Sequence, residues 1–216
     1  MGFGMAMCRL LVAALLTAPA LVQGQAEQAR TLTDPPSIPI PQLLRPGDVT
    51  VTLDPGLLPP LEAEISSSMP AGDLLRGHAK AADWVVVGKV VERRAHLTPD
   101  ETWIVTAVHV EVLEQFKPKA GATEAVIEIE EQGGTVSIDG VTVTAVATWQ
   151  QRLGAGETYL LFVTKTSRRA QLDWSYRINS GRRLESTFPP FLSGEAFDTA
   201  DGLRLEQARV ILRSGV

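Results

Sequence analysis

Residues 84–93 read WVVVGKVVER. Five of these ten residues are valines, and β-branched side chains favour strands, so the run predicts a β-strand. Gly88 interrupts the run, and a glycine inside a strand usually marks a bulge or a bend where another backbone comes close. A long strand that coils around a barrel needs such a bend, so the run favours a small β-barrel.

The strand pattern continues through the rest of the chain. A second strand is predicted over residues 103–116, where Ile104, Val108, Val110 and Val112 form one face and His109 and Glu111 lie on the other. Asp139 and Gly140 predict a two-residue hairpin turn, because both residue types tolerate positive φ. Further strands are predicted over residues 125–129, 136–138, 141–143, 159–163 and 172–178.

Two helices complete the predicted domain. A short helix is expected from about Asp73 to Ala82, and a closing helix begins near Leu205 and ends at Gly215. Six or seven short strands with few helices indicate a mainly β protein. We expect a small antiparallel barrel of the oligonucleotide/oligosaccharide-binding (OB) type, with a short helix before its first strand and a C-terminal helix. A β-sandwich is the alternative.

Residues 1–24 resemble a secretory signal peptide. Arg9 precedes an apolar run at residues 10–16, and small residues follow it up to Gly24. The chain's one cysteine, Cys8, lies before that run and would be removed with it. We therefore expect an exported protein, periplasmic or extracellular, that has no disulfide and is held together by core burial alone.

Prolines dominate the next segment, residues 25–70, which is predicted to be a tether because proline removes backbone donors. Residues 49–53 alternate in polarity and could add an edge strand to the body. The barrel domain is then expected over residues 71–216. After residue 24 no apolar run approaches the roughly 20 residues of a membrane helix, so we predict a soluble monomer without a transmembrane segment.

Charge argues against a nucleic-acid partner. Without residues 1–24 the chain keeps 19 basic and 25 acidic side chains, and an acidic surface repels nucleic acid. The acidic residues gather at 124–131 and the basic ones at 165–183. The two clusters are interpreted either as solvated sheet faces or edges, or, for the basic one, as a patch for an acidic partner.

Three segments carry a resemblance to a known family. Residues 82–91 read ADWVVVGKVV, residues 108–114 read VHVEVLE, and residues 156–163 read GETYLLFV. Across roughly residues 78–180 the chain resembles the strand core of the netrin-like superfamily, an OB-like barrel group that includes the tissue inhibitors of metalloproteinases and exported bacterial proteins. Those inhibitors chelate the protease zinc through an N-terminal cysteine, which this chain lacks. The resemblance therefore implies a fold, and no functional residue is transferred.

Motifs for catalysis or cofactor binding are missing from the sequence. A thiol-free mature chain excludes a cysteine nucleophile, a thiolate zinc site and a redox pair. No serine-hydrolase elbow or Walker loop is present, so we expect no cofactor, no metal and no enzyme activity. His109 and Glu111 share a strand face and leave open a hydrolase with a dispersed site.

We therefore expect a noncatalytic module that binds a protein or glycan partner. The candidate interaction residues are Trp103, His109, Glu111, Arg177, Arg182 and Arg183. Trp103 shares the parity of His109 and Glu111, which predicts a partly exposed aromatic residue beside them. A protease inhibitor that acts through an inserted loop is a further alternative, suggested by the family resemblance alone.

Overall fold

A computed structural model describes most of the chain. The described residues are 28–33, 36–54, 69–117, 124–147, 152–165, 170–187 and 199–215. The predicted signal peptide and most of the proline-rich segment after Asp54 lie outside them.

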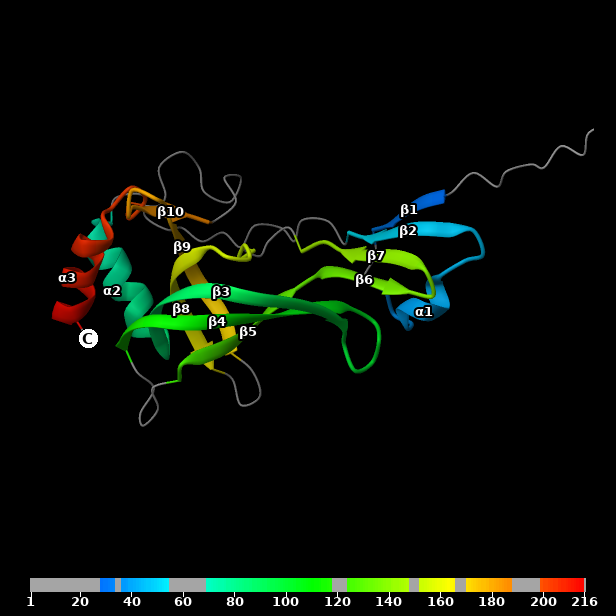
Figure 1. Cartoon of the computed structure of the whole chain (residues 1–216), viewed down its shortest axis with the longest axis horizontal. Helices are drawn as coiled ribbons and strands as arrows, with labels where there is room; N and C mark the ends of the chain where they lie inside the picture. Colours follow the sequence, from blue (N-terminus) through cyan, green and yellow to red (C-terminus); the bar gives the residue numbers. More distant parts are fainter. Residues whose placement is uncertain are drawn as a thin grey trace, which may run out of the picture.

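Ten strands and three helices make up the described fold (Figure 1). The strands are β1 (Gln28–Leu32), β2 (Asp48–Leu53), β3 (Trp84–Leu97), β4 (Ile104–Lys117), β5 (Val126–Gln132), β6 (Gly134–Ile138), β7 (Val141–Ala145), β8 (Thr158–Lys165), β9 (Ala170–Ile178) and β10 (Leu184–Ser186). The helices are α1 (Ile40–Leu43), α2 (Ala71–Ala81) and α3 (Leu205–Gly215). Neither α2 nor α3, each of 11 residues, nor the shorter α1 is long enough to cross a membrane.

Six strands form a sheet that curls into an OB-like barrel. Its order is β10-β9-β5-β4-β3-β8, and β8 also pairs with β9, which brings the two sides of the sheet together. All pairings are antiparallel except β5 with β9, where Ile129 and Glu130 pair in parallel with Ala170 and Gln171. The predicted mainly β fold, with a helix before the first barrel strand and a helix at the C-terminus, is confirmed.

Gly88 has the role that the sequence predicts for it. The register between β3 and β4 shifts at Val87/Gly88. A Cβ built on Gly88 would lie 2.3 Å from Val110 Cγ1 and 3.2 Å from the Glu111 carbonyl oxygen. Only glycine therefore allows β4 to cross this closely at the bend.

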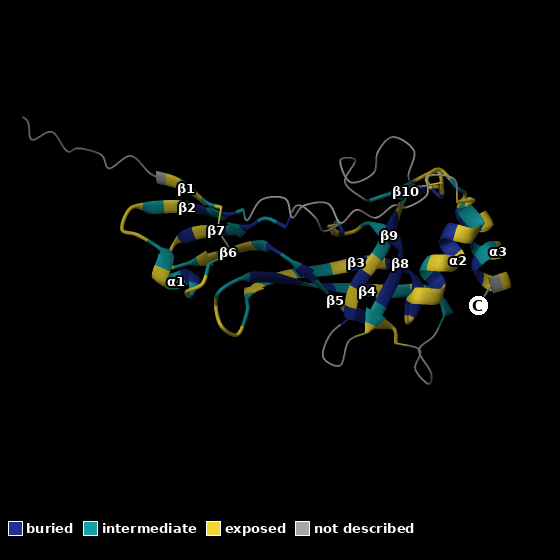
Figure 2. Ribbon diagram, turned by 180° about the vertical axis from the view of Figure 1, so that it is seen from behind, coloured by how far each residue is buried: buried dark blue, intermediate teal, exposed yellow. Residues whose placement is uncertain are grey.

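Buried and exposed residues alternate along strands such as β7 and β9 (Figure 2). The buried residues form three apolar clusters that hold the fold together. The first fills the barrel and includes Trp84, Val110 and Leu161. The second packs α2 and α3 against the outer side of β3, β8 and β9. Lys117 of β4 also donates hydrogen bonds to the carbonyls of Ala79 and Ala82, where α2 ends, which suits the negative end of the helix dipole.

The third cluster lies at the far end of the molecule from α2 and α3, between the β3–β4 hairpin and a second sheet (Figure 1). This sheet has the order β1-β2-β7-β6, and its β6–β7 turn has positive φ at Asp139 and Gly140, as predicted. The segment 49–53 is a strand, but it lies inside the sheet between β1 and β7 and not at an edge. The predicted tether thus contributes β1, α1 and β2 to regular structure.

Candidate functional site

A pocket of about 260 Å³ lies between α3 and the outer side of the barrel. Its lining residues are Val87, Leu113, Glu114, Thr158, Ile178, Arg182, Leu205 and Arg209. They come from β3, β4, β8, β9, the β9–β10 turn and α3. Half of them are apolar, and we call this feature the α3 pocket. Leu113 is its most open apolar residue, with 54% of its surface exposed.

Ion pairs hold α3 beside this pocket. Glu114 of β4 accepts hydrogen bonds from Arg209 and Arg213 of α3, each at 2.8 Å. Glu206 of α3 in turn lies 2.9 Å from Arg182 of the β9–β10 turn and 3.5 Å from Arg209. The rim of the pocket is therefore charged and fixed on two sides.

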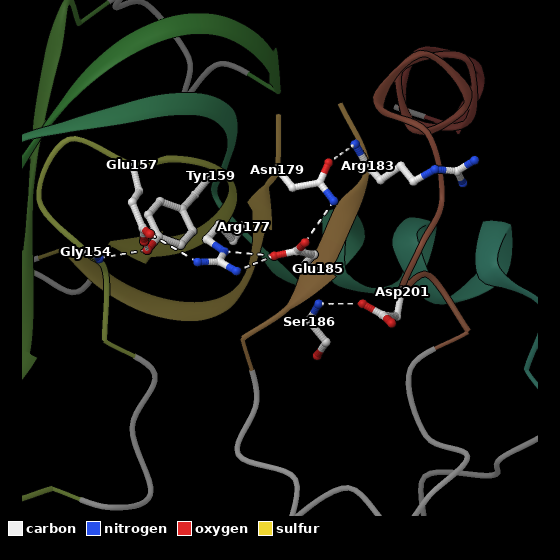
Figure 3. Close-up of polar contacts among 9 residues, drawn as sticks. All are labelled: Gly154, Glu157, Tyr159, Arg177, Asn179, Arg183, Glu185, Ser186 and Asp201. Atoms are coloured by element: carbon white, nitrogen blue, oxygen red, sulfur yellow. Dashed lines mark hydrogen bonds and ion pairs between the residues drawn. The ribbon is translucent and has the colours of Figure 1, made fainter. Parts of the chain in front are cut away.

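The β9–β10 hairpin carries Ile178 and Arg182 into the pocket, and a polar network fixes this hairpin (Figure 3). Arg177 lies between two carboxylates, 3.1 Å from Glu157 Oε1 and 2.9 Å from Glu185 Oε2. Asn179 donates to Glu185 Oε1 at 2.8 Å and accepts from the Arg183 backbone N–H at 3.0 Å. The turn closes at Arg182, which has a φ of 56°.

The same polar network includes Tyr159 of β8 and the loop before that strand. Tyr159 Oη donates to Glu157 and accepts from the Gly154 N–H at 2.7 Å. Burial, with this bond to Glu157, raises the pKa of Tyr159 to about 12. The Tyr159 hydroxyl and then Arg177 lower the pKa of Glu157, and Asn179 and then Arg177 lower that of Glu185. Both glutamates are thus held as carboxylates, and Tyr159 keeps its proton.

Backbone contacts join the hairpin to the segment that leads into α3. The Leu184 N–H donates to Leu203 O at 2.9 Å, and the Leu205 N–H donates to Arg182 O at 2.9 Å. Asp201 accepts from the Ser186 N–H at 2.8 Å (Figure 3). Arg183 Nη1 donates to Gly202 O at 2.7 Å. These hydrogen bonds therefore hold the hairpin and the start of α3 together beside the pocket.

His109 lies on a different part of the surface, the outer face of β3, β4 and β5. Its Nδ1 lies 3.2 Å from Glu92 of β3, and its Nε2 lies 2.9 Å from Glu128 of β5. The hydrogen bonds to Glu128 and then to Glu92 raise the pKa of His109. Both ring nitrogens are engaged by carboxylates, so His109 joins three strands. Glu111, two residues along β4, is exposed.

Trp103 lies apart from His109. It ends the β3–β4 turn, where its backbone N–H donates to Thr98 Oγ1 at 3.1 Å. Its ring is half-buried and packs against the third cluster, beneath the second sheet. Within the described residues, no group of three His, Asp or Glu side chains is arranged to hold a metal ion.

The six sequence-predicted residues therefore fall into three places. Arg177, Arg182 and Arg183 come together on the β9–β10 hairpin, His109 and Glu111 lie on the β4 face, and Trp103 lies under the second sheet. Arg177 and Arg182 face glutamates and Arg183 faces a backbone carbonyl of the same fold, so the charges of Arg177 and Arg182 are paired. Charge spacing along the chain does not reveal such pairings.

Sequence reasoning missed the α3 pocket. One signal for it was present, because Leu113 has the same parity as His109 and Glu111 and so places an apolar side chain on the polar face of its strand. A scan against protein-family models finds no match for this chain, and a search of curated proteins finds no relative.

Proposed function

We propose that this chain is an exported, noncatalytic protein-binding module, and that the α3 pocket receives an apolar side chain of the partner protein. The observation that carries the proposal is Leu113, an apolar residue with 54% of its surface exposed at a pocket whose rim is charged. Protein interfaces have this arrangement, an apolar centre surrounded by a polar rim. Their binding energy is concentrated in a few anchor side chains that fill pockets.

The size of the pocket suits a side chain. Its volume of about 260 Å³ is smaller than the roughly 300–1,000 Å³ that sites for drug-sized ligands offer. The apolar lining residues are the aliphatic side chains Val87, Leu113, Ile178 and Leu205. An aliphatic lining favours an apolar amino-acid side chain over a glycan, which would stack on aromatic rings.

The surroundings of His109 favour binding over hydrolysis. A general base needs a ring nitrogen that can take a proton from the substrate. Glu92 and Glu128 occupy both nitrogens of His109. Glu111 is exposed, and the carboxylates that contact the His109 ring are those of Glu92 and Glu128.

The experiment compares two exposed apolar residues of neighbouring strands. Peptides are selected on the purified protein from a phage-displayed random library, and their affinities are measured for Leu113→Asp and Val126→Asp. Leu113 lines the pocket, whereas Val126, with a similar exposed fraction of 50%, does not. We expect Leu113→Asp to abolish binding and Val126→Asp to leave it unchanged, with both variants folded.

Two results would contradict the proposal. Equal affinity of the selected peptides for both variants would place the binding surface elsewhere. The second is that no peptide is selected, that the protein binds glycans on an array, and that Leu113→Asp abolishes this glycan binding. The partner would then be a carbohydrate and not a protein. Export is tested separately, by the mass of the mature N-terminus, which we expect to follow Gly24.

A further inference from the structure

Lys89 of β3 lies next to two residues that line the α3 pocket. It pairs with Thr158 of β8, which lines the pocket, and it lies two residues after Val87, which also lines it. Residues two apart on a strand share a face, and the Cβ atoms of directly paired residues lie roughly 4.5–5.5 Å apart. The exposed Lys89 side chain therefore begins beside the pocket, on the same face of β3 as Val87.

Lys89 differs from the other cations around the pocket. Arg182, Arg209 and Arg213 each have a glutamate of the same fold within hydrogen-bond distance. The Lys89 ammonium forms no ion pair or hydrogen bond with any residue that the structure describes. Glu111 of β4 lies opposite Lys89 in the register, yet no ion pair joins them. Arg182, Arg209 and Arg213 thus share the carboxylates of Glu114 and Glu206, and the Lys89 ammonium contacts neither of them.

We propose that the partner places an aspartate or glutamate beside its apolar anchor, and that this carboxylate binds the ammonium of Lys89. The partner segment is thus acidic and apolar together: its apolar side chain enters the α3 pocket, and its acid lies over β3. This inference rests on the proposed function, because it describes the partner of the same site. Paired charges at the rim of an interface mainly set specificity and the association rate, so charge selects the partner here.

The test uses the peptides selected above from the displayed library. We expect those that depend on Leu113 to carry an acidic residue next to their apolar anchor. Changing that acid to its amide should weaken binding to the wild type about fivefold, the effect of an exposed ion pair of about 1 kcal/mol. Lys89→Glu should weaken the acidic peptides at least as much, and a peptide with lysine in place of the acid should bind Lys89→Glu better than the wild type.

Glu111→Gln is the matched control. It removes the carboxylate opposite Lys89 and should leave acidic peptides bound as tightly as before, or tighter. Peptides that depend on Leu113 but bind the wild type and Lys89→Glu equally would overturn this inference and leave the pocket as the docking site. Peptides that do not depend on Leu113 would contradict the proposed function itself.

Discussion

Arg209 Nη2 of α3 lies 2.6 Å from Glu114 Oε2 of β4, and this pair fixes the helix at the rim of the α3 pocket. Arg213 binds the other oxygen of the same carboxylate at 2.8 Å. Only 19% of the Glu114 side chain is exposed, so the pair is shielded from solvent more than a typical surface ion pair. The contact adds to the apolar packing of α3 against the barrel and fixes the helix beside β4.

Glu114→Ala should therefore destabilise the protein by about 1–2 kcal/mol, since hydrogen bonds to charged groups contribute more than neutral ones. Urea unfolding measures this change as a lower midpoint with an unchanged slope. Glu111→Ala, on the same strand and exposed, is the control and should change stability by less than about 0.5 kcal/mol. Equal effects of the two substitutions would show that Glu114 does not hold α3.

Gly88→Ala should cost about 1–3 kcal/mol, because the added methyl group meets Val110 Cγ1 in the barrel interior. Val110→Ala removes Cγ1 of Val110, so Gly88→Ala should destabilise the Val110→Ala variant less than it destabilises the wild type. The two changes in unfolding free energy should therefore not add. A double-mutant cycle by urea unfolding measures the coupling. Strict additivity would mean that the bend at Gly88 can relax without Val110.

His78 should make stability fall in acid. It is packed against Trp174, with ring centroids 4.6 Å apart, and burial lowers its pKa to about 4. Because the unfolded chain takes up this proton near pH 6.5 and the folded protein does not, stability is full above about pH 6.5 and falls as the pH drops toward 4. The loss should reach up to about 3 kcal/mol.

Unfolding His78→Phe between about pH 4 and pH 7 tests this expectation. The variant keeps an aromatic ring against Trp174 and cannot be protonated, so its stability should vary less with pH across that interval. An unchanged pH profile would assign the acid sensitivity to other groups.

His109 should act in the opposite direction. Its raised pKa means that protonation stabilises the fold, so its contribution is present below about pH 6.5 and is lost as the pH rises through the folded-state pKa. His109→Gln should remove this part of the pH dependence and leave the His78 part intact. The NMR chemical shifts of the His109 ring measured against pH give its pKa directly. A pKa at or below that of a free histidine would contradict the hydrogen bonds from His109 to Glu92 and Glu128.

Much of the strand layout was predictable because it depends on local alternation. The bend at Gly88, the Asp139–Gly140 turn and the end of α3 at Gly215 follow from the conformational preferences of a few neighbouring residues. The second sheet was not predictable from the sequence, because β2 pairs in parallel with β7, about ninety residues away. The prolines around β2 suggested a tether instead. Sequence periodicity does not encode such distant pairings.

The site was harder to predict than the fold for the same reason. The pocket unites residues from Val87 to Arg209, so no single segment carries its pattern. Trp103 shows a related difficulty, since strand parity places it with His109, whereas its half-buried ring packs against the third cluster. The arginines of the last hairpin were identified from the sequence, but their glutamate partners lie on other segments.

The most direct test of the proposed docking site is the change in backbone amide NMR shifts when a selected peptide is added to the wild-type protein. The account predicts that the largest changes fall on the amides of Val87, Leu113, Thr158, Ile178 and Leu205, which line one pocket but come from five elements. Large changes confined to the second sheet or to the strands around His109, with the amides of the pocket unmoved, would contradict it.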